Sequence, residues 1–170
     1  RFLDFLELAP RSSKPRTRGL TTVGEHGYPI GWLGEMLDMW GEYIDIIKLT
    51  PTSLHAPGDS MEKKVKLYRD HDIGVGTDDP IFAIAYYQGK AEQLLRTLRD
   101  IGFTHVQIDT QHIKLEGTGN SQKAREDESR YVALARELGF KVTGEVGLKT
   151  PEGDIARAGA GVLNVDAVVE

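Results

Sequence analysis

The sequence predicts an α/β protein built on a parallel sheet, and three observations carry this prediction. Short runs rich in β-branched residues alternate with amphipathic stretches along the 170 residues. Each strand-plus-helix unit takes roughly 25–35 residues, the length of a right-handed crossover unit. Twice, a helix-like stretch ends at a glycine that leads directly into a phenylalanine, at Gly102-Phe103 and Gly139-Phe140. Glycine adopts the left-handed conformation that ends a helix, so each pair predicts a helix end followed by a strand.

Six segments have the composition of buried strands, because they are apolar, β-branched and mostly bounded by glycine. In chain order they are Arg18–Val23, which is the weakest, Tyr43–Thr50, Ile73–Thr77, Phe103–Asp109, Phe140–Val146 and Val165–Glu170. The helices expected between them have apolar residues every three or four positions, the spacing of one helix face. These helices are Ile30–Trp40, Met61–His71, Ile81–Ile101 with a break at Gly89, and Gln122–Leu138.

Two architectures fit this order: an open doubly wound sheet and a closed (β/α)8 barrel, or TIM barrel. The G-x-G-x-x-G fingerprint of the first is absent, because Gly74-Val75-Gly76 is followed by Thr77-Asp78-Asp79. A closed barrel typically takes around 250 residues and eight units, whereas about six units fit in this chain. We therefore expect one barrel domain over residues 1–170, truncated or partly unseen at its C-terminal end.

The composition excludes several classes of protein. Lys and Arg number 21 against 26 Asp and Glu, a formal net charge of −5, so a general nucleic-acid or membrane-surface binder is not expected. The absence of cysteine excludes disulfides, thiolate metal sites and a thiol nucleophile. No apolar run approaches the roughly 18 residues that span a bilayer, and no signal-peptide pattern is present. We expect a cytoplasmic protein with a small anionic substrate, and a homo-oligomeric state stays open.

Polar residues gather at the predicted carboxyl ends of the strands, where sites form in parallel α/β folds. The two-residue period of a strand places Lys48 on one face with Ile44 and Ile46. A lysine on that face is costly unless its ammonium reaches the barrel mouth or an anionic partner. The same period pairs Gln107 with Asp109, Thr143 with Glu145, and Asp166 with Glu170. Asp78 and Asp79 add two carboxylates after the third strand.

Each of the candidate carboxylates also has an ordinary structural explanation. Asp78, Asp79 and Asp109 could cap the helices that follow them. Glu145 and Glu170 could be structural partners of Lys or Arg. The sequence by itself leaves both explanations open at every one of these positions.

The basic candidates are open to the same question. Lys48 could be a surface lysine on a strand of different register. His112, in Asp109-Thr110-Gln111-His112, is more often a loop histidine than a ligand, and we keep it as a candidate substrate contact. No G-x-S-x-G nucleophile motif is present, so a serine-based hydrolase is not indicated.

Several of these residues lie in blocks that resemble the phosphosulfolactate synthase family. The blocks are Lys14–Thr21 (KPRTRGLT), Tyr43–Lys48 (YIDIIK), Gly139–Val142 (GFKV), Glu145–Gly147 (EVG) and Val168–Glu170 (VVE). Their order and spacing resemble the family over most of the chain, with its last two barrel strands expected beyond Glu170. The resemblance implies a (β/α)8 lyase that adds sulfite to phosphoenolpyruvate with Mg²⁺ in coenzyme M biosynthesis. The family also includes plant heat-stress-associated relatives.

The resemblance and the strand-end positions together define three groups of expected site residues. Lysines are expected to bind anions, one of them acting as general acid, and carboxylates are expected to hold Mg²⁺. The catalytic group is Lys48, Lys149 and Glu145; the metal group is Asp109, Glu145 and Glu170; the substrate-binding group is Arg16, Arg18, Asp78, Asp79, Gln107 and His112.

The chain also departs from the family pattern at three places. Asp78-Asp79-Pro80 stands where the family tends to have Gly-Gly-Thr, Gln107 where it has a glutamate, and Leu148 where it often has a lysine. A carboxylate beside an anion repels it by about 1–4 kcal/mol at surface-like dielectric unless a metal intervenes. Pro80 also removes a backbone donor.

These departures keep two alternatives open. The first is a diverged barrel enzyme acting on another enol or unsaturated acid, with Asp78 and Asp79 in metal binding or proton transfer. The second is a non-catalytic, stress-related relative. Gln107 favours this alternative, because it replaces the acidic side chain of the family by an uncharged one.

Overall fold

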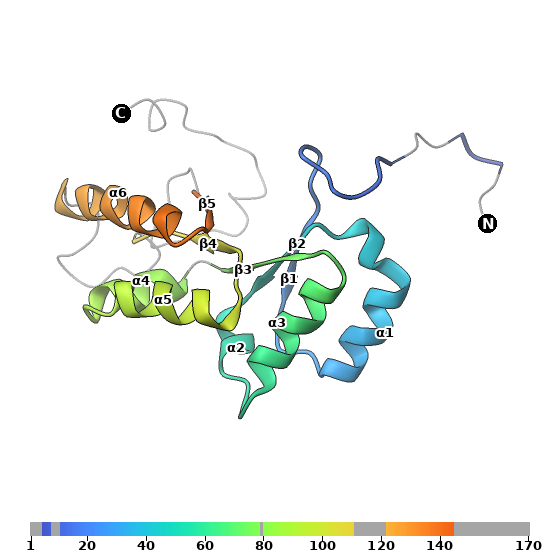
Figure 1. The fold of residues 1–170 in the computed structure, drawn as a ribbon, viewed down its shortest axis with the longest axis horizontal. Helices are drawn as coiled ribbons and strands as arrows, with labels where there is room; N and C mark the ends of the chain where they lie inside the picture. The colour runs from blue at the N-terminus through green and yellow to red at the C-terminus, as the bar shows by residue number, and fades with distance from the viewer. Residues whose placement is uncertain (1–4, 8–10, 79, 111–121, 145–170) are drawn as a thin grey trace, which may run out of the picture.

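The structure is a computed structural model that describes residues 5–7, 11–78, 80–110 and 122–144. Over these ranges strands and helices alternate along the chain (Figure 1). The strands are β1 (Thr22–Glu25), β2 (Ile46–Leu49), β3 (Gly74–Thr77), β4 (His105–Gln107) and β5 (Lys141–Thr143). The helices are α1 (Ile30–Trp40), the 3₁₀ turn η1 (Gly41–Tyr43), α2 (Pro51–Leu54), α3 (Ser60–Asp70), α4 (Pro80–Tyr87), α5 (Ala91–Ile101) and α6 (Gln122–Glu137).

The strands form two parallel sheets in chain order, β1-β2-β3 and β4-β5. The two sheets meet where β3 lies beside the start of β4. There the N–H of Thr104 donates to the Val75 carbonyl at 2.9 Å. The Thr104 hydroxyl accepts the N–H of Val75 at 2.9 Å, in the place of a backbone carbonyl. A side chain therefore continues the hydrogen bonding between β3 and β4.

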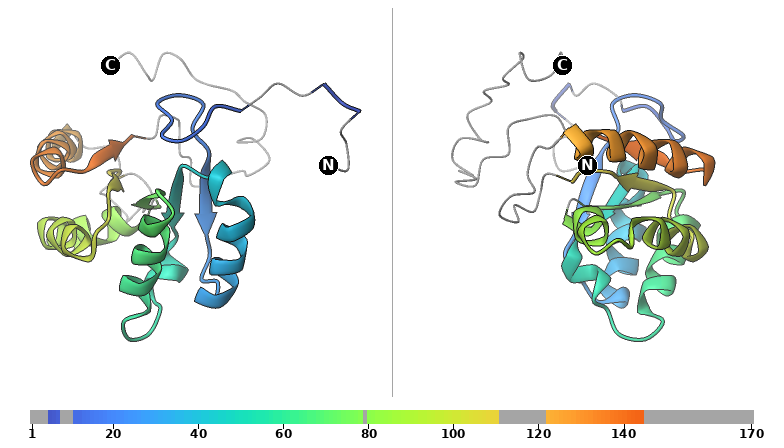
Figure 2. Two further views of the ribbon diagram at one scale, coloured as in Figure 1. Left: turned by 45° about the vertical axis from the view of Figure 1, so that its right-hand side comes forward. Right: turned by 90° about the vertical axis from the view of Figure 1, so that its left-hand side faces the viewer.

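The larger helices form one layer in which neighbours contact in chain order: α1 with α3, α3 with α5, and α5 with α6. Figure 2 shows α5 and α6 together at one end of this layer and α1 at the other. Ile47, Val75 and Val106 point from the strands into the core beneath these helices and are almost fully buried. Alternation then turns Ile46 and Lys48 to the opposite side of the sheet.

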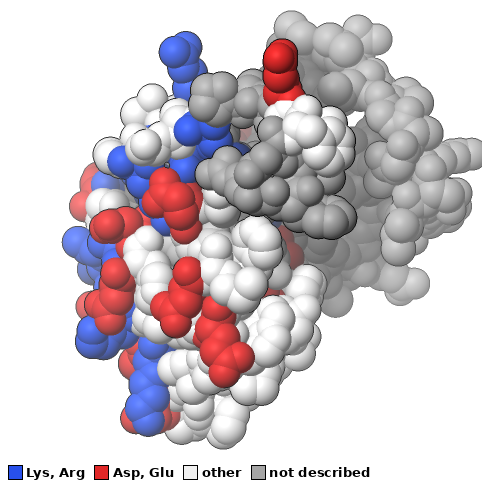
Figure 3. Space-filling model, turned by 90° about the vertical axis from the view of Figure 1, so that its right-hand side faces the viewer, with Lys and Arg blue, Asp and Glu red and all other residues white. Residues whose placement is uncertain are grey.

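The outward flank of α1 is apolar although nothing in the described chain covers it. Trp32, Met39 and Trp40 are about half exposed or more. Figure 3 views this side and shows uncharged surface interrupted by carboxylates. Figure 2 shows α1 running beside β1, the outer strand of its sheet, so among the described residues an apolar flank and a strand edge are both uncovered there.

Two predicted strands have different bounds in the structure. The strand expected at Arg18–Val23 runs instead over β1, and the one expected at Tyr43–Thr50 is shortened to β2. Just before β2, the N–H groups of Asp45 and Ile46 both donate to the Thr21 carbonyl, an arrangement typical of a β-bulge. The bulge turns Ile44 into the helix-side core, so the prediction that Ile44 shares a face with Lys48 is wrong.

The remaining elements agree with the predictions within a few residues. The long helix divides at Gly89, which has φ +69°, into α4 and α5. Gly102 and Gly139 adopt positive φ and end α5 and α6, as their sequence contexts predict. The short helix α2 was not predicted, and the strand expected at Val165–Glu170 lies outside the described residues.

The α/β class, with parallel strands alternating with helices, is therefore confirmed. Closure into a (β/α)8 barrel stays a prediction. Within the described ranges, no helix combines the length and the apolar character needed to cross a membrane.

Candidate active site

Lys48 and Asp78 meet at the carboxyl ends of β2 and β3. The Lys48 Nζ lies 2.9 Å from Asp78 Oδ1, and the two side chains are 26% and 35% exposed. The N–H of Asp78 donates to the Leu49 carbonyl at 3.1 Å, so strand pairing continues past β3 and holds the carboxylate beside the lysine. The register partners of Lys48 are Gly24 and Gly76. The side chains of His26 and His105 lie against these two glycines, where a Cβ would come within 3.2 Å and 3.0 Å of them.

His26 lies in the loop that follows β1, and its imidazole is close to the same strand ends. A Cβ on Gly24 would lie 3.2 Å from the Nε2 atom of His26, so the imidazole lies against Gly24, the register partner of Lys48. Sequence reasoning missed His26 because it placed the first strand too early. A strand ending at Glu25 would have put His26 at the carboxyl rim.

The carboxyl end of β4 supplies the next polar groups. Gln107 and Asp109 are both buried, and the N–H of Gln107 lies 3.4 Å from the Thr77 hydroxyl that accepts it. Both side chains therefore belong to the packed interior near the strand ends.

Two helices clamp the segment that follows β4. The N–H of Thr110 donates to Glu128 Oε1 at 2.7 Å, and the Thr110 hydroxyl donates to the same oxygen. The Tyr87 hydroxyl donates to the Thr110 carbonyl at 3.0 Å, and the Tyr86 hydroxyl donates to Asp127 at 2.7 Å. Burial, assisted by Asp127, raises the pKa of Tyr86 to about 12, so this phenol remains a donor at neutral pH. These bonds hold the segment around Asp109 in place.

Comparison with known proteins identifies the family to which the chain belongs. The family model for (2R)-phospho-3-sulfolactate synthase (ComA) matches residues 9–167. The chain belongs to the phosphosulfolactate synthase family. The phosphosulfolactate synthase of Methanothermobacter thermautotrophicus is 31% identical over 153 residues, which cover 89% of this chain and 55% of that protein. That of Methanocaldococcus jannaschii is 32% identical over 138 residues, covering 81% and 52%.

A more distant relative is the phosphosulfolactate synthase of Bacillus subtilis, 26% identical over 148 residues that cover 86% of this chain and 54% of that protein. This family member spans about half the length of the curated relatives it matches. The resemblance inferred from the sequence blocks is therefore confirmed at the level of the family.

The structure brings only part of the predicted site together. Lys48 and Asp78 are in direct contact, and Gln107 and Asp109 lie at the end of β4. The remaining predicted residues at this rim lie outside the described residues: Asp79, His112, Glu145, Lys149 and Glu170.

Arg16 lies at the opposite ends of the strands from Lys48. Its side chain is 2% exposed and its guanidinium pairs with Asp45, just before β2, at 2.9 Å. It also donates to the Glu42 carbonyl at 2.8 Å and to the Ser12 carbonyl at 2.6 Å. Arg18 is exposed in the same N-terminal segment. In this phosphosulfolactate synthase family member, Arg16 therefore anchors the chain, away from the rim where its predicted anion contact would be needed.

Burial by itself would raise the pKa of Asp45. The Thr21 N–H, which donates at 2.8 Å, and the Arg16 guanidinium outweigh that effect and hold the pKa below its usual value. Arg11 adds a further contact at 3.2 Å. Asp45 is therefore ionised at neutral pH and holds the N-terminal segment against β2.

Glu25 is a buried carboxylate that sequence reasoning did not single out. Its Oε1 accepts the Gly27 N–H at 2.7 Å and lies 3.2 Å from the Nζ of Lys64, which is also buried. Its carbonyl accepts the hydroxyls of Thr50 at 2.9 Å and Ser53 at 2.6 Å. Glu25 thus ties together the loops after β1 and β2, on either side of Lys48. No motif marks it; only its burial does.

The oxygen donors at the rim suit a hard cation such as Mg²⁺, which prefers carboxylate and carbonyl oxygens. Asp109 is the member of the predicted metal group that the structure describes. Among the described residues, however, no three His, Asp or Glu side chains gather in a way that could hold a metal. The expected ligands Glu145 and Glu170 belong to the part of the chain that is not described.

Proposed function

We propose that this rim is the active site of a carbon–sulfur lyase that adds sulfite to phosphoenolpyruvate with Mg²⁺. The observation that carries the proposal is the contact between Lys48 and Asp78 at the carboxyl ends of adjacent parallel strands. Family membership supports the reaction type, and the position supports the site, because parallel α/β folds place their chemistry at this end of the sheet.

We further propose that the strands belong to a (β/α)8 barrel. Strand order follows chain order within each sheet, and the helices form one consecutive layer, which a doubly wound fold would divide between two faces. The uncovered flank of α1 beside β1 lies where a closing unit of the barrel would pack.

Hydrogen exchange tests closure. The carbonyls of Thr21 and Glu25 both accept N–H groups from the β2 side, so alternation directs the N–H groups of Thr22 and Gly24 to the other edge of β1. Closure would pair that edge. In the full-length protein these two amides should therefore exchange slowly, and fast exchange at both would contradict a closed barrel.

The reaction needs positive charge and a proton donor at one place. The sulfite lone pair forms a C–S bond to C3 of phosphoenolpyruvate, and the π electrons of the double bond move toward the carboxylate. A proton delivered to C2 then completes phosphosulfolactate. Lys48 supplies an ammonium that can bind the anion and deliver this proton. The imidazole of His26, which lies against Gly24, adds a nitrogen-bearing ring near Lys48.

Mg²⁺ would be held by Asp109 together with Glu145 and Glu170. When bound, it supplies positive charge beside the substrate carboxylate. The hydrogen bonds from Thr110 to Glu128 and from Tyr87 to Thr110 keep Asp109 in position before any ligand arrives. The Asp109 carboxylate is therefore already ordered in the folded protein, so its conformational entropy is lost on folding and not on ligand binding.

Asp78 does not prevent anion binding at Lys48. A single ion pair between partly exposed side chains contributes about 0–1 kcal/mol, so a phosphate or sulfite with more charge can replace the carboxylate. Asp78 then acts as a counterion that keeps Lys48 charged and oriented when no substrate is present.

The same contact supports a second candidate function. If Asp78 takes part in proton transfer or metal binding, the enzyme acts on another enol or unsaturated acid that carries less negative charge. The substitution Asp78→Asn separates the two functions. A displaceable counterion predicts a lower KM for phosphoenolpyruvate with kcat preserved, whereas a catalytic carboxylate predicts a loss of kcat on the alternative acid.

The test of the main proposal uses the full-length protein with phosphoenolpyruvate, sulfite and Mg²⁺, and follows the product by ³¹P NMR and mass spectrometry. The variant Lys48→Gln should lose about 10²–10⁴-fold in rate, the usual contribution of a positioned acid. Lys66→Gln is the matched control, because Lys66 lies on the surface in an ion pair with Asp70. The proposal fails if the wild-type protein forms no sulfonate, or if Lys48→Gln is as active as the control.

A further inference from the structure

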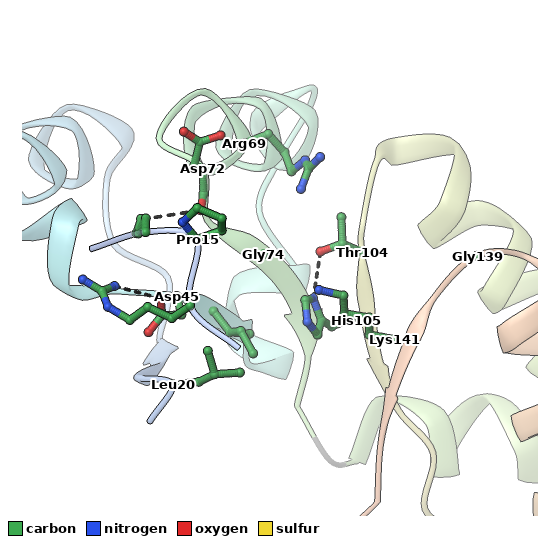
Figure 4. A pocket seen from close by; sticks show the side chains of 13 residues that line it. Pro15, Leu20, Asp45, Arg69, Asp72, Gly74, Thr104, His105, Gly139 and Lys141 are labelled. Atoms are coloured by element: carbon green, nitrogen blue, oxygen red, sulfur yellow. Dashed lines mark hydrogen bonds and ion pairs between the residues drawn. The ribbon is translucent and has the colours of Figure 1, made fainter. Parts of the chain in front are cut away.

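A hollow lies at the amino ends of the strands, opposite the rim that carries Lys48. It has a volume of about 530 Å³. Its walls come from the N-terminal segment, the end of α3 and the first residues of β3, β4 and β5 (Figure 4). The apolar part of the wall is Pro15, Leu20 and Ile46.

Two cations border this hollow without a carboxylate partner. Arg69 comes from the last turn of α3 and Lys141 from the start of β5. Within the described ranges neither takes part in an ion pair. The other two basic residues in the wall are already engaged: Lys14 donates to the His71 carbonyl at 3.0 Å, and Arg16 pairs with Asp45.

His105 lines the same hollow as these two cations. It is the register partner of Lys141, so both side chains are on the same face of the sheet. Its ring lies directly against Gly74, where a Cβ would come within 2.5 Å of the His105 Cε1. Burial, followed by the charges of Lys141 and Arg69, lowers the pKa of His105 to about 4, so the ring is neutral at neutral pH.

Thr104 is hydrogen-bonded to the ring of His105. The Thr104 hydroxyl lies 2.8 Å from His105 Nδ1 and 3.3 Å from the Val75 carbonyl. Because the hydroxyl has one proton to donate, His105 Nδ1 either accepts that proton or donates its own to the hydroxyl oxygen, and Nε2 takes the other role. His105 therefore presents a neutral imidazole with one N–H group, and a ligand can select which nitrogen carries the proton.

We propose that this hollow binds the dianion of a small organic phosphate monoester. Arg69 and Lys141 pair with the phosphate oxygens, and the anion selects the tautomer in which His105 Nε2 carries the proton and donates to one of them. Charge-assisted bonds from guanidinium and ammonium groups are the usual means of holding phosphate. Pro15, Leu20 and Ile46 contact the apolar body of the ligand.

The carboxylates in the wall do not oppose such a ligand. Asp45 is neutralised by Arg16 and Arg11. Figure 4 shows the Asp72 carboxylate directed away from His105. With Arg16 balancing Asp45 and Lys14 balancing Asp72, the net charge of the wall equals that of Arg69 and Lys141. The site is separate from the proposed lyase site and does not depend on it, because the two lie at opposite ends of the strands.

The probe is phenyl phosphate, added to the full-length protein and followed by calorimetry and by the His105 Cε1–H resonance. Arg69→Gln and Lys141→Gln should each weaken binding at least tenfold, while Lys66→Gln, on the surface of the same helix, should not. Lys48→Gln should leave this binding unchanged. Bound dianion should also raise the pKa of His105 from about 4, because an adjacent negative charge favours the imidazolium.

Arg69 and Lys141 are exposed, so their variants should fold, and thermal unfolding of each verifies this. The proposal is overturned if phenyl phosphate does not bind at millimolar concentration, or if binding survives in both variants. Loss of binding in Lys48→Gln alone would place the ligand at the carboxyl rim. Equal affinity for inorganic phosphate and phenyl phosphate would overturn the assignment of an organic ligand.

Discussion

The two ends of the strands carry the same type of ion pair in different surroundings. At the amino end, Arg16 is 2% exposed and bonds to Asp45 and to two backbone carbonyls. At the carboxyl end, Lys48 is 26% exposed and bonds to Asp78 through one contact. Burial and the number of hydrogen bonds, more than the charges themselves, therefore separate an anchor from a group that can exchange its partner.

The physical basis of this difference is the cost of an unpaired charge. A buried charge that loses its partner keeps the full cost of desolvation, so the pair stays closed. A partly exposed charge is hydrated when its partner leaves, so a ligand can take the partner's place. Chemistry with an anionic substrate requires the second situation.

Glu25 and Lys64 show that the face of the sheet matters as well as the end. Glu25 lies at the carboxyl end of β1, close in sequence to the rim, but its side chain is buried against Lys64 on the helix side. It therefore belongs with the anchors. We therefore expect substitutions to lower the free energy of unfolding most at the Glu25–Lys64 pair and least at Lys48.

The largest effect is expected for Glu25→Gln. The substitution keeps the shape of the side chain but leaves the Lys64 ammonium buried without a counterion, which should lower the free energy of unfolding by about 3–5 kcal/mol. Urea denaturation measures this change. Adding Lys64→Met should recover part of the loss, because both charges are then absent. A loss below about 1 kcal/mol, typical of exposed pairs, would remove Glu25 from the group of anchors.

Asp45→Asn should have the next largest effect, about 2–3 kcal/mol at pH 7, because it weakens the hydrogen bonds from Arg16 and Thr21 to a charged group. The folded pKa of Asp45 lies below its unfolded value of 3.8. Its contribution is therefore fully present above that value and is lost as the pH falls through the folded pKa. The variant and the wild type should converge in urea denaturation at acidic pH. Asp70→Asn, in an exposed pair, is the control, and an equal effect there would contradict the comparison.

Gly74→Ala tests how closely His105 fits at the amino end. A Cβ at this position meets the imidazole at 2.5 Å, so the ring or the strand must move, at a cost of about 1–3 kcal/mol. Thermal unfolding measures the loss. Gly34→Ala in α1 has nothing within 4 Å and should instead stabilise the protein by up to about 1 kcal/mol through helix propensity. Equal behaviour of the two variants would show that the His105 ring can leave Gly74 freely.

The smallest effect on stability is expected for Lys48→Gln. The pair with Asp78 is partly exposed and has a single contact, so the free energy of unfolding should fall by less than about 1 kcal/mol. Urea denaturation alongside Asp45→Asn gives the direct comparison. A loss as large as that of Asp45→Asn would mean that Lys48 is an anchor, and the proposed site would lose its exchangeable cation.

Part of the candidate site follows from the sequence because strand periodicity and topology are repetitive. Lys48 near the end of one strand and Asp78 after the next must meet if neighbouring strands are parallel. Gln107 and Asp109 follow from the same rule. His26 and Glu25 did not follow, since the first strand was expected several residues too early.

Local patterns thus determined the helices, the glycine-ended junctions at Gly102 and Gly139, the order of the strands and the meeting of Lys48 with Asp78. The tertiary structure alone decided which charges became anchors. Arg16 and Asp45 are 29 residues apart in the chain, and Glu25 and Lys64 are 39 apart. Periodicity specifies the face and the end at which a side chain lies. Its partner and its burial depend on segments that folding brings together from distant parts of the chain.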